Sequence, residues 1–574
     1  IAALEFNQKL DFLTEGLSLK ALASFKNWSS STNARAGKWN RFALTGYEED
    51  GNGGYTYTTS RIGDEFQTDL TATNSTSGDR RFYLEGMLNY SRTFDEHDIN
   101  AMFIYSQDEY VNNVPGNGNF IGSLPKRKQG VAARASYAYA GKYMAEVNVG
   151  YNGSENFAKG HRFGLFPSVA VGYNISEENF FKPLKNTISK LKLRASWGLV
   201  GNDQISDARF LYMSQINLSG KGFTTGVNQN VTYSGPVYQR YANEDITWEV
   251  GEKINFGVDL QLFRSLDLTF DIFRENRRDI FQEKQTVPTY MGTASTKVYG
   301  NLAAMRNQGF ELAASYNKQF NKDWFVSFKG TFTYAHNEIT KYDESPKYPW
   351  QSKVGASANM NAIYIADGLF IDSEDIAHHQ QQLGSTIVPG DIKYVNVSRD
   401  WYGYDDNLTD TDDWVWAKYP SVPEIVYGFG PSIKWKNLDF SFFFQGVAKT
   451  SFMVKDMHPF GDNSLRNVLS WIADERWSPD NQNTNATYPR LSRKTNANNT
   501  KLSTYWQRNG AFLKLKNAEI GYTHKNMRIY ISGSNLLTFA PFKLWDPEQG
   551  GGSGLSYPTQ RVFNIGFQMT INNK

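Results

Sequence analysis

A group of aromatic side chains in the polar middle of the chain is the best candidate for contact with a ligand. The flat rings of tyrosine and tryptophan stack on sugar rings and on the side chains of peptides. Aromatic residues also cap loops and anchor membrane strands, so a purely structural role is the alternative at each position. The residues that we assign to substrate binding are Tyr348, Trp350, Trp401, Tyr402, Tyr404, Trp414, Trp416 and Tyr419.

Two other groups have the chemistry of metal ligands. His378 and His379 follow several carboxylates, but adjacent histidines rarely face one ion and the HExxH spacing is absent, which favours a solvated helical turn. The stretch Asn396–Asp400 lacks the spacing and the turn glycine of a calcium loop, so we predict no metal and keep calcium as the alternative. The acidic run that begins in this stretch contains Asp400, Asp405, Asp406, Asp410, Asp412 and Asp413.

The sequence gives no support for catalysis, a cofactor or nucleic-acid binding. We find no GxSxG elbow, no P-loop and no spaced carboxylate pair, and we therefore do not predict an enzyme. The chain has 0 cysteines, which excludes disulfides, thiolate metal sites and a cysteine nucleophile. Its 60 basic and 58 acidic residues leave a net charge of +2 without a basic stripe, so nucleic acid is not an expected partner.

Strands must position the aromatic residues, because the composition is that of a β protein. Aromatic residues make up 15% of the 574 residues, and such residues collect in strands and at membrane interfaces. No run approaches the roughly 20 consecutive apolar residues of a transmembrane helix. A chain of this kind can cross a membrane only as a closed barrel, which satisfies all its backbone hydrogen bonds within itself.

Pairs of alternating polar and apolar runs, each joined by a very short turn, recur along the chain and predict β-hairpins. The clearest pair runs from Arg81 to Phe94 and from Asp98 to Tyr110, and it places Phe82, Leu84, Gly86, Leu88 and Tyr90 on one face. With a last strand from Gln560 to Ile571, the pattern predicts about 17 strands. The other connections expected between paired strands are Thr14 to Gly16, Gly141–Lys142, Ser176 to Lys190, Arg264 to Leu266, Asn321 to Asp323, Trp435 to Asn437 and His524 to Asn526.

Long polar segments rich in Gly, Asn, Asp, Ser, Tyr and Trp separate the hairpins. Tight turns on one side and long loops on the other are typical of outer-membrane barrels. A soluble β-sandwich or propeller is the alternative, but soluble strands are usually only about 5 or 6 residues long. We therefore predict an all-β transmembrane antiparallel barrel with long extracellular loops at 31–79, 203–245, 339–420, 449–509 and 539–559.

A series of short stretches along nearly the whole chain matches one family of proteins. They are Phe12–Leu19, the turn at Phe94–His97, Arg162–Phe181, Leu191–Asn202, Thr247–Phe263, Arg306–Leu312, Asp367–Phe370, Pro389–Tyr394, Glu475–Leu491, Leu513–Tyr522 and Ile531–Phe539. On these stretches the chain resembles the SusC/RagA-like TonB-dependent transporters of Bacteroidota. Each matching stretch is weak alone, but their order along the chain is that of the family. Within them, Gly198, Gly257 and Gly521 would relieve crowding between strands, and Trp248 or Trp477 would suit the aromatic girdle.

This resemblance implies TonB-dependent import of a nutrient across the outer membrane of a Gram-negative cell. The cargo would be an oligosaccharide (glycan) or an oligopeptide, and a SusD-like surface lipoprotein would close over it while TonB acts on a plug inside the barrel. The surrounding outer-membrane lipid is a further expected contact. A passive pore or a surface-binding barrel that lacks a plug is the alternative function.

Two features depart from the family pattern. The signal peptide, carboxypeptidase-like extension, TonB box and plug of the family do not precede Ile1, and family barrels have about 22 strands. We therefore expect residues 1–574 to be one barrel domain without the plug and without about five first strands, so that Leu4 to Leu13 is the sixth strand. The aromatic signal of the last strand lies inward, at Phe567, ahead of Asn572–Lys574.

Overall fold

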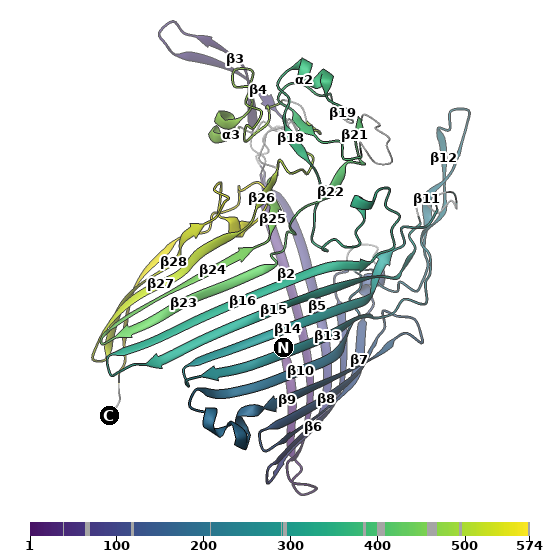
Figure 1. Ribbon diagram of the computed structural model, residues 1–574. Coiled ribbons are helices and arrows are strands. Elements are labelled where there is room, and N and C mark those ends of the chain that lie inside the picture. The colour runs from purple at the N-terminus through teal and green to yellow at the C-terminus, as the bar shows by residue number, and fades with distance from the viewer. Residues whose placement is uncertain are drawn as a thin grey trace.

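The computed structural model describes residues 1–37, 40–63, 69–115, 120–206, 208–288, 290, 296–382, 386–398, 408–455, 468–492 and 496–571. A single antiparallel sheet of 17 strands curves through most of the chain and forms a barrel wall (Figure 1). The strand number and the all-β class agree with the sequence prediction.

The strands of the wall follow one another in chain order, each paired with the next. They are β1 (Ala2–Lys9), β2 (Leu17–Ala36), β5 (Thr71–Phe94), β6 (His97–Asn112), β7 (Lys126–Tyr139), β8 (Tyr143–Ser154), β9 (Phe163–Asn174), β10 (Ile188–Asn202), β13 (Glu249–Leu262), β14 (Leu266–Glu283), β15 (Tyr299–Gln319), β16 (Trp324–Lys341), β23 (Ile425–Trp435), β24 (Leu438–Ala448), β27 (Phe512–His524), β28 (Met527–Phe539) and β29 (Val562–Met569).

The register joins the apolar residues of neighbouring strands into one continuous band. Val147 of β8 lies opposite Ala135 of β7 and Val169 of β9, and Phe310 of β15 lies opposite Ile272 and Tyr334. Because side chains alternate between the two faces of a strand, the intervening polar residues share the other face. In a membrane barrel the apolar face meets lipid and the polar face lines the lumen.

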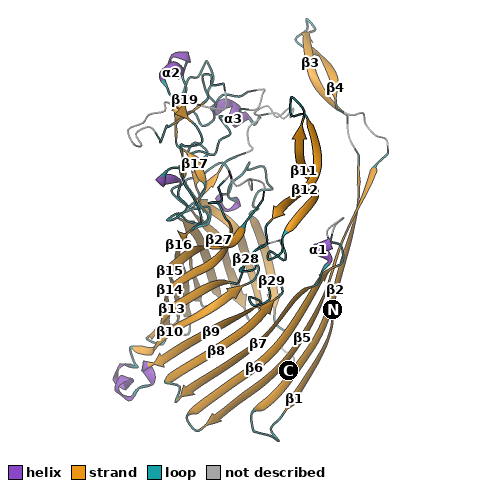
Figure 2. Ribbon diagram, turned by 90° about the vertical axis from the view of Figure 1, so that its right-hand side faces the viewer, coloured by secondary structure: helices purple, strands orange, loops and turns teal. Residues whose placement is uncertain are grey.

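All eight expected hairpins occur with their turns at the predicted places, which are the lower ends of the strands in Figure 2. The predicted boundaries are less accurate, since the first strand ends at Lys9 rather than Leu13 and the last spans Val562–Met569. The five predicted long loops are confirmed as connections at the opposite end. Three further connections at that end, 113–125, 155–162 and 284–298, were not predicted.

The long loops contain short elements of their own, so they are folded. Their paired strands are β3 (Arg41–Glu49) with β4 (Tyr55–Ile62), β11 (Gln215–Thr225) with β12 (Val231–Arg240), β17 (Ala362–Tyr364) with β22 (Trp414–Trp416), β18 (Ala366–Leu369) with β20 (Ile392–Tyr394), β19 (Gln381–Gln382) with β21 (Leu408–Thr409), and β25 (Ser451–Met453) with β26 (Gln507–Asn509).

The helices are short and lie outside the wall. They are α1 (Phe120–Ser123), α2 (Ser373–His378) and α3 (Ser470–Glu475), with the 3-10 helices η1 (Ile175–Glu177), η2 (Asn179–Leu184), η4 (Pro349–Gln351) and η6 (Pro547–Gln549). In the part of the chain that the structure describes, no helix has the length and apolar character of a membrane span.

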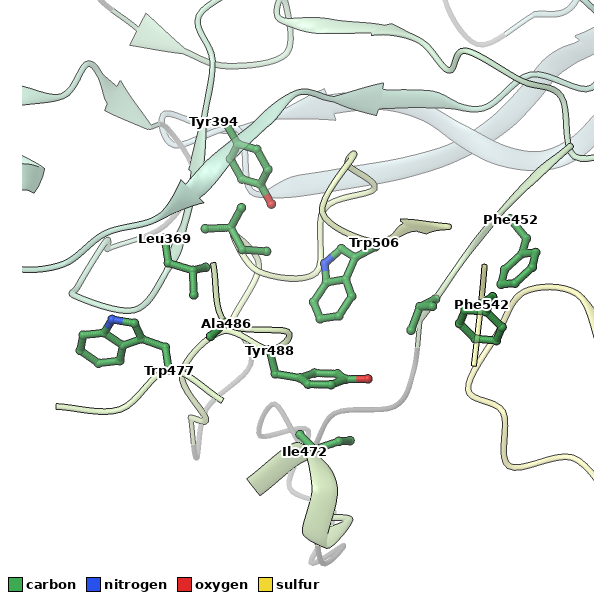
Figure 3. Packing of buried hydrophobic residues seen from close by; sticks show 11 residues of the cluster. Leu369, Tyr394, Phe452, Ile472, Trp477, Ala486, Tyr488, Trp506 and Phe542 are labelled. Carbon is green, nitrogen blue, oxygen red and sulfur yellow. The ribbon is translucent and has the colours of Figure 1, made fainter. Parts of the chain in front are cut away.

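The largest buried apolar cluster lies in the loops rather than in the wall (Figure 3). It brings together residues from three of the long loops, 339–420, 449–509 and 539–559: Leu369, Ile392, Tyr394, Phe452, Val454, Ile472, Trp477, Ala486, Tyr488, Trp506 and Phe542. Trp248, the other girdle candidate besides Trp477, packs in a second cluster with Phe157. Both tryptophans are under 10% exposed, at 7% and 4%, so their assignment to a lipid-facing girdle is wrong. Each fills a loop core instead.

Polar side chains satisfy the backbone inside this loop layer, because its short strands leave many donors without a ladder partner. Gln382 accepts from the Tyr394 backbone N–H at 2.6 Å, and Asn499 accepts from the Ile392 N–H at 2.9 Å. The Asp391 carboxylate is fully buried and accepts from Asn499 and from the Arg490 guanidinium. Two family-like stretches, Pro389–Tyr394 and Glu475–Leu491, thereby hold each other in place.

Candidate functional site

The polar face of the wall carries half-buried ion pairs across strands. The Arg194 guanidinium of β10 lies 3.1 Å from Asp259 and 3.0 Å from Asp271 on the next two strands. A Cβ on Gly257 would lie 2.5 Å from the Asp271 carboxylate, so this glycine leaves room for the pair, as predicted. Arg528 makes a second such set with Asp439 and Glu519 beside Gly521. The lumen wall is therefore polar and rigidly cross-linked.

A cleft of about 280 Å³ opens between this wall and the loops above it. Asn307 and Asn337 lie opposite each other on β15 and β16 and form part of its lining. The Asn337 side-chain oxygen accepts from the Ser357 hydroxyl and the Ala358 N–H, which leaves its amide nitrogen toward other acceptors. The remaining polar lining consists of Glu275, Arg277, Asn359 and Glu424.

Four of the predicted substrate residues form two aromatic pairs on segments that are hydrogen-bonded to each other, and we define Tyr348, Trp350, Trp414 and Trp416 together as the aromatic cluster. The rings of Tyr348 and Trp350 are stacked, with centroids 4.5 Å apart and an interplanar angle of 9°. Trp414 and Trp416 meet edge to face at 5.2 Å. The structure thus joins residues that lie more than sixty positions apart in sequence, such as Trp350 with the Asp412 carbonyl.

Hydrogen bonds fix the orientation of this cluster. The Trp350 indole N–H donates to the Asp412 carbonyl at 3.2 Å, and the Trp416 N–H donates to the Ser352 carbonyl at 2.7 Å. Lys347 forms an ion pair with Asp412 beside the Tyr348 ring, and hydrogen bonding to that carboxylate raises the pKa of Lys347. Because both indole donors have protein acceptors, a ligand would meet these tryptophans through their ring faces.

The other predicted aromatic residues are placed differently. Tyr419 lies at the loop base, where its carbonyl accepts from the Ser451 hydroxyl at 2.8 Å and the Lys418 ammonium lies 5.4 Å from its ring centre. Trp401, Tyr402 and Tyr404 lie outside the described residues. The structure therefore brings together four of the eight candidates, whereas the contacts described for Tyr419 are with Ser451 and Lys418.

The acidic residues Asp412 and Asp413, which the structure describes, bind partners within the protein. Asp413 is fully buried and accepts from the N–H groups of Val397 and Asp410 at 2.8 Å each. Asp412 pairs with Lys347. Asp400, Asp405 and Asp406 lie outside the described residues. Among the residues that have a description, no three His, Cys, Asp or Glu side chains gather as metal ligands would.

The two histidines lie at the end of α2, as the predicted helical turn requires. The His378 Nδ1 contacts the Glu374 carbonyl at 2.9 Å, and the His379 Nδ1 contacts the Gln380 carbonyl at 2.8 Å. The His379 ring meets Phe370 edge to face at 5.1 Å. Their nitrogens thus face different backbone oxygens.

Sequence reasoning did not find a cation held over two tyrosines beside the aromatic cluster. The Lys501 ammonium lies 5.0 Å from the ring centre of Tyr364 and 5.4 Å from that of Tyr394. Burial lowers the pKa of Lys501, while the charges of Asp410 and Asp413 oppose that shift. Tyr364 also pairs with Trp414 through β17 and β22. Tyr394 lies in the family-like stretch Pro389–Tyr394, and Asn307 of the cleft lies in the family-like stretch Arg306–Leu312. Membership of these stretches was the one signal in the sequence that could have pointed to either residue.

The chain matches known proteins along most of its length. A family model described as "TonB dependent receptor-like, beta-barrel" matches residues 3–536. The TonB-dependent receptor P3 of Formosa agariphila is 25% identical over 84% of this chain and 52% of that protein. The TonB-dependent receptor SusC of Bacteroides thetaiotaomicron is 25% identical over 76% of this chain and 43% of that protein.

The solved structure of the RagAB peptide transporter has the same fold. It aligns with a TM-score of 0.70 at 19% identity and covers 99% of this chain and 61% of that chain. This chain spans about half the length of the curated relatives that it matches, at 52% and 43%. Since the family model covers the wall from its first strand into β28, the chain belongs to the TonB-dependent receptor-like β-barrel family and its sheet is the wall of an outer-membrane barrel.

Proposed function

We propose that this chain forms the wall of a transporter that imports a nutrient across the outer membrane by a TonB-dependent mechanism. The observation that carries the proposal is the family match over residues 3–536, which spans nearly the whole wall. The polar face of that wall and the loop layer above it supply what an importer needs, namely a hydrophilic path and an external binding surface. The likeness to SusC favours a SusD-like surface lipoprotein as the partner.

We further propose that the cargo is an oligosaccharide or an oligopeptide and that it meets the aromatic loop residues. Stacked rings with their indole donors already occupied favour contact through ring faces, and both sugar rings and peptide side chains stack in this way. The cleft at Asn307 and Asn337 adds amide groups that hydrogen-bond to hydroxyl or peptide groups. The proposed contact residues remain Tyr348, Trp350, Trp401, Tyr402, Tyr404, Trp414, Trp416 and Tyr419.

The wall also needs strands from outside these residues. β1 pairs with β2 and β29 pairs with β28, and no described pairing joins β1 to β29. Lipid cannot hydrogen-bond to the backbone groups of two open edges. We therefore propose that residues 1–574 are one barrel domain that further strands close and a plug fills.

The test is uptake of labelled glycans and peptides by cells that carry the transporter. Deletion of TonB should abolish uptake, and removal of the SusD-like partner should weaken it. Uptake that continues without TonB would support the passive pore or surface-binding barrel instead.

A pair of tryptophan variants tests the site separately from the mechanism. Trp350→Ala should raise the KM for uptake by roughly 2- to 10-fold, since one lost aromatic contact is worth about 0.5–1.5 kcal/mol. Trp324→Ala is the matched control, because Trp324 contacts another aromatic ring, Trp435, at the opposite end of the wall, with centroids 5.7 Å apart. Equal KM values for the two variants would show that the aromatic cluster is not part of the substrate site.

A further inference from the structure

The connection between β9 and β10 differs from the other connections at the tight-turn end of the wall. Residues 175–187 form η1 and η2, whereas the neighbouring hairpin at 263–265 is a tight turn. Phe181 of this segment is buried, at 4% exposed, yet Phe180 and Leu184 are 69% and 51% exposed. Two large apolar side chains four positions apart therefore face away from the protein.

Hydrogen bonds attach this segment to the lipid-facing side of the wall. The Tyr143 hydroxyl donates to Glu178 at 2.6 Å, and Tyr173 reaches the same carboxylate at 3.4 Å. The two rings are stacked at 5.1 Å across β8 and β9. They share the face of Val147 and Val171 in the apolar band, because residues an even number apart lie on one side of a strand. The segment thus lies below the lipid face and not below the lumen.

Its depth is that of the membrane interface. Tyrosines at strand ends mark the headgroup level in membrane barrels, and Tyr137, Tyr139, Tyr143 and Tyr173 form such a row beside the tight turns. Phe263 in the next turn is also 60% exposed, and its N–H donates to the Thr187 carbonyl at 2.8 Å. The apolar side chains of the segment continue a surface that already meets lipid.

Basic side chains accompany these apolar ones in the segment. Lys182 is exposed, while Lys185 pairs with Glu177 at 3.2 Å and Lys142 pairs with Glu178 at 3.4 Å. Segments that expose apolar side chains beside lysines lie in the interface, with the rings and aliphatic chains in the acyl boundary and the ammonium groups at the phosphates.

We propose that residues 175–187 are an interfacial foot, whose Phe180 and Leu184 insert into the periplasmic leaflet while its lysines contact phospholipid headgroups. The foot holds the wall at a fixed depth and fixes the β9–β10 hairpin against the bilayer. In Figure 2 it is the pair of purple coils beside the lower ends of β9 and β10, which extends outward from the wall. This inference rests on membership of the barrel family and does not depend on the cargo.

These 574 residues contain no cysteine, so a cysteine introduced among them is labelled without background from this part of the transporter, and any cysteine elsewhere would first be replaced by serine. Phe180→Cys and Leu184→Cys would each be made in the whole transporter, labelled with an environment-sensitive fluorophore and reconstituted into phospholipid nanodiscs. Nitroxide-labelled lipids report contact with the bilayer, and aqueous iodide reports contact with water. Val147→Cys in the apolar band is the lipid control, and Lys525→Cys in the exposed β27–β28 turn is the water control.

The foot predicts blue-shifted emission at positions 180 and 184 compared with position 525. It also predicts stronger quenching by a nitroxide near the headgroup end of the acyl chain than by one near the methyl end, with the reverse preference at position 147. Quenching by iodide equal to that at position 525 would overturn the proposal. Protection from both iodide and nitroxide lipid at positions 180 and 184 would also overturn it, because a protein surface would then cover these residues.

Discussion

Two adjacent residues in the middle of β7 allow a sharp test of which face of the wall meets lipid. Ala135 lies opposite Ala101 and Val147 in the apolar band. Ser136 lies opposite Asn100 and Glu146 and lines a cavity of about 460 Å³ on the polar face. Both side chains are small, so arginine at either position adds a similar volume, and the two variants differ mainly in what surrounds the new charge.

Ala135→Arg should destabilise the wall strongly. An arginine at the bilayer midplane of a membrane barrel costs about 2–4 kcal/mol, which corresponds to a roughly 30- to 700-fold loss in the folding equilibrium constant. Ser136→Arg should change the free energy of unfolding by less than about 0.5 kcal/mol. Its guanidinium enters a hydrated cavity and lies next to the Glu146 carboxylate.

The assay is guanidinium unfolding of the whole transporter in lipid vesicles, followed by the shift in gel mobility that distinguishes folded from unfolded barrels. The midpoint should fall for Ala135→Arg and stay near the wild-type value for Ser136→Arg. Equal midpoints for the two variants, or the opposite order, would refute the assignment of the faces.

Three further predictions concern the loop layer. Arg490→Met should destabilise this layer by about 3 kcal/mol, because it leaves the buried Asp391 carboxylate without its cation. Limited proteolysis should then show faster cleavage near residue 490 while the barrel stays folded. An unchanged cleavage rate would contradict this prediction. Gly390→Ala should also destabilise the loop layer, because Gly390 has φ +84 and a Cβ there would lie 2.2 Å from the Trp477 ring. Faster hydrogen exchange at the Ile392 N–H is the measurement. Burial alone would raise the pKa values of Asp546 and Glu548, but hydrogen bonds from Lys514 and their other donors outweigh it and lower both. Because both pKa values are lower in the folded protein than in the unfolded chain, the two carboxylates stabilise the segment 546–549 at pH values above the ordinary carboxyl range near pH 4. This stabilisation is lost as the pH falls through their pKa values in the folded protein. The hydrogen-exchange protection factors of residues 546–549 should therefore fall in acid, and Lys514→Met should weaken that pH dependence while Lys516 still pairs with Glu548.

The hairpins and the family could be predicted from the sequence because both depend on local patterns. Strand alternation and tight turns depend on residues that are neighbours in the sequence. The strand Arg81–Phe94 and its partner strand were therefore predicted with the turn at the right place. Strand boundaries were predicted less well, because β2 and β5 continue their pairing as far as Ala36 and Thr71 into a segment expected to be loop. Backbone pairing extends there without an apolar pattern to signal it.

The proposed substrate surface shows most clearly what the sequence predicts and what only the fold decides. Composition alone identified Tyr348, Trp350, Trp414 and Trp416 as aromatic loop residues, but only the fold stacked the first two and tied them to Asp412. Likewise, no local pattern placed Trp477 over Gly390 or Lys501 over Tyr364 and Tyr394. Period-two alternation is a property of one strand and can be read from sequence. Contacts between loops join residues far apart in the chain, and their partners are decided by packing, burial and charge pairing in three dimensions.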